Sequence, residues 1–247
     1  MFKKKKIFAI ITARGGSKSI PNKNIKKING KPLVYYSIKT GLESRLIDRV
    51  IMSTDSKKIM SISKKYNCET PFLRPRKFSG DRSTDFEVFN HLVGWLKKND
   101  ELPSYFVHLR PTHPIRDIKE IDKAIKSIVK KPNYDSLRSL SVSKETPFKM
   151  WTKKNGQITP VIKFKQFRES HSIPRQLLPI TYWQNGYVDI IKVDTIIKMK
   201  SMAGKKVMPF LVSKESHDID YRNELKFIKK NFFKIKYSKK KILRTPS

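Results

Sequence analysis

The sequence is poor in cysteine and has no long hydrophobic run, and both absences limit what the protein can be. Cys68 is the single cysteine, so an intrachain disulfide and a cysteine-based zinc cluster are excluded, which fits a reducing, cytoplasmic location. No stretch approaches the ~18 apolar residues of a membrane span. The apolar run from Ile7 to Ile11 follows Lys3 to Lys6 and imitates a signal peptide, but Arg14 ends it early, so we interpret it as the first core strand.

Acidic residues are also scarce: 21 Asp and Glu stand against 55 Lys and Arg, for a formal net charge of +34. Such a charge attracts polyanions, so nucleic acid or an anionic membrane is an alternative partner. The lysines are spread over the whole length, however, and no basic motif with interleaved aromatic residues, of the RNA-binding kind, is visible. The pattern favours a general compositional bias and no specific nucleic-acid partner.

Glycine is infrequent, yet Gly15 and Gly16 are adjacent and directly follow the first apolar run. Without a Cβ, the backbone can turn tightly there and bring its N–H groups close to a ligand. Arg14, Lys18 and Lys23 lie in the same loop and match the charge of an oligophosphate. The loop therefore predicts a cradle for a nucleoside triphosphate, although it is neither GxxxxGK[ST] nor GxGxxG. An ordinary polar loop between a strand and a helix is the alternative.

Apolar spacing predicts alternating strands and helices after this loop. Val34, Ile38 and Leu42 are spaced as one face of a helix, and Arg49–Asp55 has the pattern of a buried strand that ends in a helix cap. The further predicted elements are strands at Cys68–Leu73, Tyr105–Leu109, Ser136–Val142 and Val207–Val212, and helices from Thr84 or Asp85, from Ile118 and around Glu224. This alternation predicts a mostly parallel sheet with ligands at the carboxyl ends of its strands.

The order of these motifs resembles a known family. A strand, then A-R-G-G-S-K-S-I-P-N-K-N, then Gly30-Lys31-Pro32-Leu33 is similar to the signature of the acylneuraminate cytidylyltransferases, the CMP-sialic acid synthetase family, and the resemblance extends to about Asp220. It implies a single cytidylyltransferase domain over 1–247, with the three-layer α/β/α, Rossmann-like fold of nucleotide-diphospho-sugar transferases and a mostly parallel mixed sheet. It also implies a dimerisation arm at about 144–179 and leaves a basic tail at about 229–247.

The resemblance places a nucleotide site on the glycine loop and on the polar loop after Leu73. The residues that it implies for nucleotide binding are Ala13, Arg14, Gly15, Gly16, Ser17, Lys18, Lys23, Asn24, Arg74 and Thr84. Arg74 and Thr84 belong to R-P and D-x-[ST]-[ST] elements that line the cytidine pocket in the family. From the residues alone, Arg74 is a loop charge and Thr84 a helix cap, and Thr84 can serve both roles.

On the sugar side, Arg110–Arg116 looks like the family's L-Q-P-T-S-P-L-R element and implies Arg110 and Thr112 as substrate-binding residues. Arg110 replaces the usual Gln, and His113 replaces the usual Ser. Because arginine only donates hydrogen bonds, the partner of Arg110 should be an acceptor, such as a carboxylate or hydroxyl of the sugar. His113 could be imagined as a general base, but a lone histidine in a loop is more often structural.

Three more substrate-binding residues follow from the resemblance: Asn185, Lys149 and Arg175. Asn185 lies in a segment similar to R-P-N-G-A-I-Y-I, although Asn185-Gly186 is also simply a good tight turn. Lys149 and Arg175 lie in the arm, which in the family reaches into the sugar pocket of the other subunit of a homodimer. In so basic a chain either residue could instead be a surface charge.

Asp218 and Asp220 stand out in a chain with few acids. In an extended segment their side chains point to one side, and two convergent carboxylates favour a cation between them. Mg²⁺ prefers carboxylate oxygens together with nucleotide phosphates, so the pair predicts a magnesium site, and the family's metal-binding D-[IV]-D stands at the corresponding place. A cap of the following helix is the alternative. With Arg14 and Lys23, Asp220 completes the predicted catalytic set.

These observations predict a cytoplasmic cytidylyltransferase that uses Mg²⁺ to join CTP to an acidic keto sugar of the nonulosonate class, giving a CMP-sugar and pyrophosphate. Activation of 3-deoxy-manno-octulosonate, or another sugar nucleotidyl transfer, is an alternative within the same fold. A polybasic protein without catalytic activity, which binds RNA or a membrane surface, is the alternative from another class.

Overall fold

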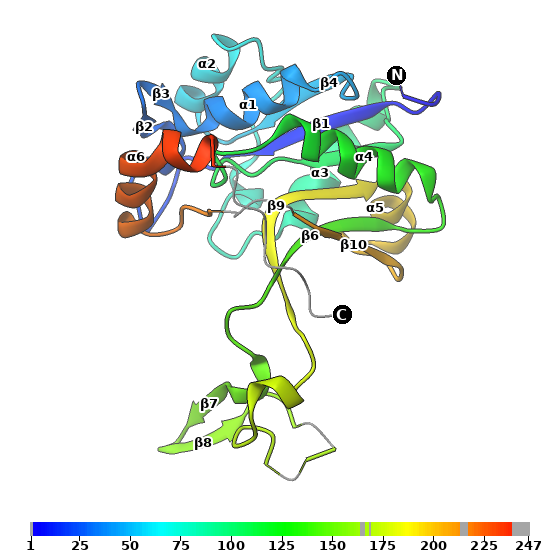
Figure 1. Cartoon of the computed structure of the whole chain (residues 1–247). Helices are drawn as coiled ribbons and strands as arrows, with labels where there is room; N and C mark the ends of the chain where they lie inside the picture. The colour runs from blue at the N-terminus through cyan, green and yellow to red at the C-terminus, as the bar shows by residue number, and fades with distance from the viewer. Residues whose placement is uncertain (1, 164–165, 168, 213–216, 239–247) are drawn as a thin grey trace. The chain divides into compact units, whose positions relative to one another are not determined.

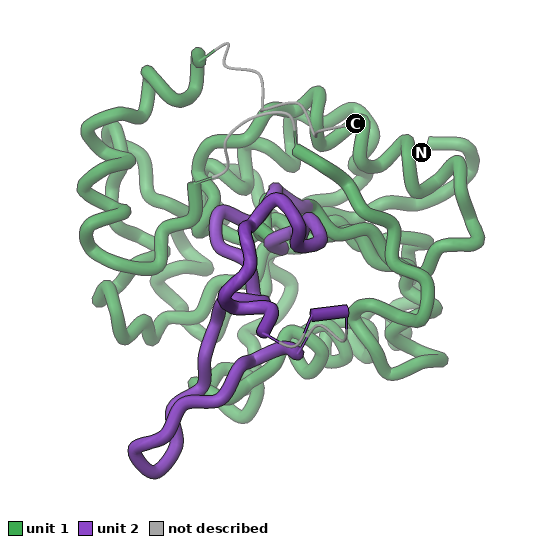
Figure 2. Tube along the Cα trace, turned by 60° about the horizontal axis from the view of Figure 1, so that its bottom comes forward, with its two compact units in different colours: residues 1–139, 185–247 green, residues 140–184 purple. Residues whose placement is uncertain are grey.

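The computed structural model describes residues 2–163, 166–167, 169–212 and 217–238 (Figure 1). The chain forms two compact units, residues 1–139 with 185–247, and residues 140–184 (Figure 2). Within the described ranges, no helix has the length and apolar character needed to cross a membrane.

The first unit is organised around a six-stranded sheet of order β10-β6-β9-β5-β1-β4. Its strands are β1 (Ile7–Thr12), β4 (Arg49–Ser53), β5 (Tyr105–His108), β6 (Ser136–Val142), β9 (Tyr182–Lys192) and β10 (Val207–Leu211). β1 is parallel to both neighbours, so that Ala9 lies opposite Val50 and Val107. β9 is antiparallel to β5 and sets Asp189 opposite His108. The mixed sheet confirms the predicted α/β class.

Helices cover both faces of the sheet, because successive side chains of the buried strands point to opposite sides. The helices of one face are α1 (Leu33–Glu43), α2 (Lys57–Lys64) and α4 (Ile118–Lys130), and those of the other are α3 (Asp85–Lys98) and α5 (Val193–Met199). On β1, Ala9 packs in the core with α1, α2 and α4, whereas Ile10 packs with α3 and α5. The result is the predicted three-layer architecture.

A third apolar cluster holds the C-terminal helix α6 (Arg222–Lys236) against the segment after the glycine loop. Leu225, Ile228 and Phe232 of this helix pack with Ile20 and Ile28. The short elements of this region are the 3-10 helix η1 (Lys23–Ile25) and the strands β2 (Lys27–Ile28) and β3 (Lys31–Pro32). A further 3-10 helix, η2 (Arg76–Phe78), lies in the polar loop after Leu73, between α2 and α3. The glycine loop is thus tied to the C-terminal part of the chain.

The second unit contains a two-stranded antiparallel sheet and two 3-10 helices. Its elements are η3 (Pro147–Lys149), β7 (Trp151–Lys154), β8 (Gln157–Pro160) and η4 (Arg175–Leu177). Asn155 and Gly156 connect the strands with φ of 50° and 78°, the left-handed backbone that a tight hairpin turn requires. The expected arm at about 144–179 lies inside this unit.

Three local expectations were wrong. Leu42 is 48% exposed, because α1 turns Gly41 toward the sheet, where an added Cβ would lie 2.9 Å from Val50 Cγ2. Cys68–Leu73 forms only two isolated parallel bridges. Asn185-Gly186 is no tight turn but lies within β9, where Gly186 has a φ of 66°.

At the C-terminus, α6 continues through residues 229–236 of the proposed basic tail. The rest of the proposed tail, 239–247, lies outside the described residues.

Candidate active site

The predicted site residues of the first unit gather around loops that follow the carboxyl ends of β1, β4 and β5. The glycine loop follows β1 at Thr12, the loop that begins at Thr54 follows β4, and Leu109 to Asp117 follows β5. Because these three strands are parallel and adjacent, their following loops meet at one edge of the sheet.

The glycine loop is held close to the loop after β4. Ala13 is buried, and its N–H donates to Ser53 O at 3.0 Å, while the Gly15 N–H donates to Asp55 Oδ1 at 2.8 Å. An added Cβ on Gly15 would lie 3.1 Å from Ser56 Cβ, so close packing favours glycine there, whereas a Cβ on Gly16 would meet nothing within 4 Å. The backbone N–H of Gly15 is therefore already hydrogen-bonded to the Asp55 side chain.

Two of the predicted phosphate-binding cations share one carboxylate. Arg14 Nη1 lies 3.0 Å from Asp81 Oδ1, and Lys18 Nζ lies 2.6 Å from Asp81 Oδ2. The hydrogen bond from Lys18, with the charge of Arg14, holds the pKa of the Asp81 carboxyl below its ordinary value. Lys18 remains 78% exposed, and Ser17, next to it, is half-buried. Asp81 therefore occupies the place on these cations that a phosphate would take.

Lys23 connects the glycine loop with the D-x-D segment. Its Nζ donates to Asp220 Oδ1 at 2.9 Å and to Ile219 O at 3.0 Å, and the lysine side chain is only 15% exposed. The neighbouring Asn24 is buried and donates from Nδ2 to Arg14 O at 2.9 Å, which fixes the backbone beside Arg14. Predicted residues almost two hundred positions apart thus meet in one place.

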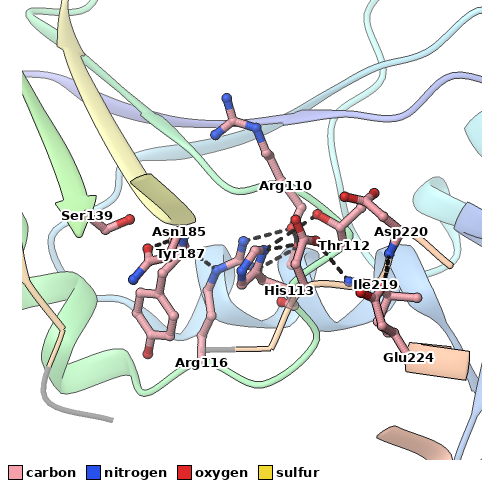
Figure 3. A network of polar contacts seen from close by, with 12 residues as sticks. Arg110, Thr112, His113, Arg116, Ser139, Asn185, Tyr187, Ile219, Asp220 and Glu224 are labelled. Carbon is pink, nitrogen blue, oxygen red and sulfur yellow. Dashed lines mark hydrogen bonds and ion pairs between the residues drawn. The ribbon is translucent and has the colours of Figure 1, made fainter. Parts of the chain in front are cut away.

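Asp218 of the D-x-D segment is affected by burial and by its neighbour Asp220. Burial raises the pKa of the Asp218 carboxyl, and the charge of Asp220 raises it further, while a hydrogen bond with Thr112 opposes the shift. Ile219 N–H donates to Thr112 O at 3.0 Å, so that the loop after β5 supports this segment (Figure 3). Glu224 Oε2 accepts the N–H of Asp220 at 2.6 Å and caps the start of α6. Neither aspartate is the helix N-cap, which is Tyr221.

A divalent cation fits this arrangement. The Asp218 carboxyl, whose pKa is raised by burial and by the charge of Asp220, would be stabilised in its ionised form by a cation beside both carboxylates. Among the described residues there is no group of three or more His, Cys, Asp or Glu that could hold a metal ion. The protein therefore offers two oxygen donors from Asp218 and Asp220, and a magnesium ion here would need phosphate or water oxygens to complete its shell.

Arg74 and Thr84 flank the loop that carries Asp81. Arg74 is only 4% exposed, and it donates to Ser79 Oγ at 2.9 Å and to Ser53 O at 3.2 Å; burial lowers its pKa. Thr84 caps α3, since its Oγ1 accepts the Glu87 N–H and Glu87 in turn accepts the Thr84 N–H. The helix cap predicted for Thr84 is present. Its predicted role in nucleotide binding stays a prediction.

Arg110 is bound on both sides by carboxylates. Its Nη2 lies 2.6 Å from Asp85 Oδ2, and its Nη1 pairs with the fully buried Asp189, which also pairs with Arg138 at 3.0 Å. Burial would lower the pKa of the Arg110 guanidinium, but Asp189 and then Asp85 outweigh it, so the pKa is raised. Arg110 is predicted from the sequence to bind substrate, and the structure pairs it with carboxylates of the protein itself.

The interpretation of the sequence missed Arg116, which organises the loop after β5. Its guanidinium donates to the carbonyl oxygens of Tyr187 at 2.7 Å, His113 at 2.6 Å and Arg110 at 2.7 Å (Figure 3). Burial is the main cause that lowers the pKa of Arg116 to about 10. Its place at the end of the Arg110–Arg116 element was the available signal, but no pattern distinguishes a buried arginine from a surface one.

Asn185 lies beside this loop with part of its amide group unused. Its Oδ1 accepts the Tyr187 N–H at 3.1 Å, and its buried Nδ2 has no hydrogen-bond partner among the described residues. His113 is 1% exposed, and burial holds its pKa well below the ordinary value, so it is neutral at pH 7. A buried amide N–H group without a partner could donate a hydrogen bond to an oxygen atom of a ligand.

Lys149 and Arg175 belong to the second unit. Lys149 is exposed at the end of η3, and Arg175 is exposed at the start of η4 and donates from Nη2 to Ser143 O at 2.7 Å.

The structure gathers most of the predicted site residues at the carboxyl edge of a three-layer α/β fold, and comparison with known proteins specifies the class. The chain matches the family described as Cytidylyltransferase over residues 8–176. It is 31% identical over 224 residues to CMP-N,N'-diacetyllegionaminic acid synthase of Campylobacter jejuni, covering 90% of this chain and 92% of that protein.

Two further comparisons agree. The chain is 29% identical over 221 residues to N-acylneuraminate cytidylyltransferase of Escherichia coli, covering 88% of this chain and only half of that longer protein. The solved structure of CMP:2-keto-3-deoxy-manno-octonic acid synthetase complexed with CTP superimposes with a TM-score of 0.69 at 14% identity, covering 93% of this chain and 99% of that one. That likeness shows the shared fold.

The protein belongs to the cytidylyltransferase family and is therefore a CTP-dependent nucleotidyltransferase. Its homologues include acylneuraminate and legionaminate cytidylyltransferases, which confirms the family predicted from the sequence motifs.

Proposed function

We propose that the protein joins CTP to an acidic α-keto sugar of the nonulosonate class, such as a sialic, legionaminic or pseudaminic acid, to give a CMP-sugar and pyrophosphate. The observation that carries the proposal is the 2.9 Å contact between Lys23 and Asp220. It joins a cation suited to a triphosphate with a carboxylate suited to a metal ion. The relatives named above act on sugars of this class.

In the reaction, the anomeric hydroxyl of the sugar attacks the α-phosphorus of CTP in line with the departing pyrophosphate. A sugar oxygen–phosphorus bond forms, the bond from the α-phosphorus to the bridging oxygen breaks, and the hydroxyl proton passes to water. Arg14, Lys18 and Lys23 stabilise the charge on the phosphates, with Arg14 and Lys23 acting on the reacting groups. Since Asp81 now pairs with two of these cations, CTP must displace that carboxylate.

The remaining nucleotide contacts come from both loops. The nucleotide would also be contacted by the backbone of Ala13, Gly15 and Gly16, by the side chains of Ser17 and Asn24, and by Arg74 and Thr84. Asp218 and Asp220 would hold Mg²⁺, which supplies positive charge that neutralises the pyrophosphate.

For the sugar, we assign Thr112, Asn185 and Arg110. The unpartnered Asn185 Nδ2 donates to a sugar oxygen. Arg110 can bind the sugar carboxylate by exchanging Asp85, whose side chain is 43% exposed, while Asp189 keeps its buried place. Lys149 and Arg175 complete the pocket from the arm of a second subunit, in a homodimer. The single buried thiol of Cys68 supports a cytoplasmic location.

The first experiment incubates the purified chain with Mg²⁺, each of CTP, UTP, GTP and ATP, and a panel of acidic keto sugars that includes 3-deoxy-manno-octulosonate. Pyrophosphate release and product mass are followed. Formation of a CMP-nonulosonate supports the proposal. Turnover with the octulosonate alone, or with another nucleotide, contradicts it.

A second experiment tests the role of the D-x-D segment. Asp220→Asn should lower kcat by about a hundredfold or more, because a metal ion contributes several kcal/mol of charge stabilisation in the transition state. Asp194→Asn is the matched control, since Asp194 is exposed and pairs only with Lys198 on the surface of α5. Urea unfolding with and without Mg²⁺ and CTP supplies a readout apart from turnover: ligand stabilisation should shrink in Asp220→Asn and persist in the control.

A further inference from the structure

The outward face of α6 combines exposed aromatic rings with lysines. Its buried face, Leu225, Ile228 and Phe232, packs in the third apolar cluster. Successive residues of an α-helix are rotated by about 100° around its axis. On the side opposite the buried face, a second set of residues therefore falls within about 120° of arc. That set includes Lys226, Phe227, Lys230, Phe233, Lys234 and Tyr237, together with the polar Asn223.

The exposure of these rings is unusual for their size. Phe227 is 50% exposed, Phe233 is 59% exposed and Tyr237 is 69% exposed. Single exposed apolar side chains are common on any surface, but a group on one helix face marks a contact surface.

The same face carries uncompensated positive charge. Glu224 is the only acidic residue of α6, and it is used at the first turn, where Oε2 accepts the N–H groups of Asp220 and Tyr221. Among the described residues, Lys226, Lys230 and Lys234 have no ion-pair partner. The surface therefore calls for an anionic partner that also accepts aromatic side chains.

We propose that this face of α6 docks the protein on an anionic lipid membrane surface. The lysines are attracted to acidic headgroups, and phenylalanine, which has no polar group, inserts at the boundary between headgroups and acyl chains. A second copy of the chain is disfavoured as the occupant of this face, because Lys226, Lys230 and Lys234 of the two copies would oppose one another.

Single-stranded nucleic acid fits the rings less well. Base stacking needs free ring faces. Phe233 and Tyr237 lie parallel to each other, with an interplanar angle of 3° and centroids 6.4 Å apart, and the Phe227 ring lies 5.6 Å from that of His217. Each of these rings already contacts another aromatic ring, which suits insertion among headgroups better than stacking with bases.

The test is co-sedimentation of the full chain with phosphatidylcholine vesicles, with and without phosphatidylglycerol, at low and high salt. We expect binding only to the anionic vesicles. Replacing Lys226, Lys230 and Lys234 together by Gln should weaken it by at least about tenfold at low salt. The matched control replaces Lys119, Lys126 and Lys130 of α4, which are also exposed, and should lose much less.

A second variant separates insertion from charge. Phe227→Ser with Phe233→Ser keeps the net charge and should remove the part of the binding that survives high salt. CTP turnover and circular dichroism verify that each variant is folded. Equal losses in the α6 and α4 lysine variants would overturn the proposal, because they would assign binding to diffuse charge. Absence of vesicle binding would also overturn it, as would binding to single-stranded RNA alone.

Discussion

Acid should destabilise this protein well above the pH at which carboxylates titrate, and His108 is a main cause. His108 is fully buried at the end of β5, where Nε2 lies 2.9 Å from Thr12 Oγ1 and the ring contacts Phe89 edge-on, with centroids 5.0 Å apart. Burial, followed by the charge of Arg110, lowers the pKa of His108 to about 3. The native protein therefore keeps this imidazole neutral at any mildly acidic pH.

The sign and size of the effect follow from proton linkage. The unfolded chain binds a proton at His108 below about pH 6.5, whereas the native chain does not until about pH 3, so stability falls as the pH falls through this window. At pH 5 the loss from this one residue is about 2 kcal/mol. That is a large share of a typical unfolding free energy of about 5–15 kcal/mol. His91 and His113, whose pKa values burial also lowers, act in the same direction.

The assay is urea unfolding at pH 7 and pH 5, for the wild type and for His108→Gln. Glutamine cannot take up a proton, so the difference between the two pH values should shrink by about 2 kcal/mol, even where the variant is less stable overall. Phe89→Leu is the control: it loses packing against His108 without removing a titrating group, so its two unfolding free energies should drop together. An unchanged pH difference in His108→Gln would refute the reasoning.

Three shorter predictions follow. Gly41→Ala should lower the unfolding free energy in urea by up to about 2 kcal/mol, because a Cβ 2.9 Å from Val50 costs about 1–3 kcal/mol and the gain in helix propensity is only about 1 kcal/mol. Thr84→Ala should cost about 1 kcal/mol through the lost cap, and Thr84→Ser should restore it in the same measurement. Asp81→Asn should lower the KM for CTP by up to about fivefold at low salt with little change in kcat, since the two loop cations lose a competing carboxylate; a raised KM in steady-state kinetics would contradict this.

Periodicity predicted the core elements well, because burial of alternate strand residues and of one helix face decides them. β1, β4 and β5 and the helices between them lie where the apolar spacing placed them. The prediction for Leu42 failed because residue spacing gives the direction of a side chain around the helix axis but not which residues it faces. On α1 the nearest approach to the sheet falls at Gly41, where Val50 leaves no room for a larger residue.

Asn185-Gly186 shows a different limit. Its dipeptide is typical of a turn, and Gly186 does have the left-handed φ of 66°, so the local preference was real. The long strand β9 absorbs that conformation without reversing direction.

At the candidate site, the sequence predicted which residues take part but not which residues they contact. Lys23 and Asp220 were each predicted from their own motif, yet nothing in either motif states that they touch. For Arg110, the missing information was a pair of acids in other elements. Asp189 offered a signal, since it is the one charged residue in the apolar run around Val188 and Ile190, and a buried acid needs a cation.

The pairing of cations at the site has a consequence for how CTP is captured. Arg14 and Lys18 share Asp81, and Lys23 pairs with Asp220, so each predicted phosphate cation already faces a carboxylate. Binding CTP exchanges one anion for another at these side chains, and the local gain is smaller than that of a free cation meeting a phosphate. The local exchange of anions does not reduce the long-range attraction of CTP to a chain with a formal charge of +34. Salt should therefore slow the association of CTP much more than it speeds its release, since screening acts on approach over distance and little on groups in contact.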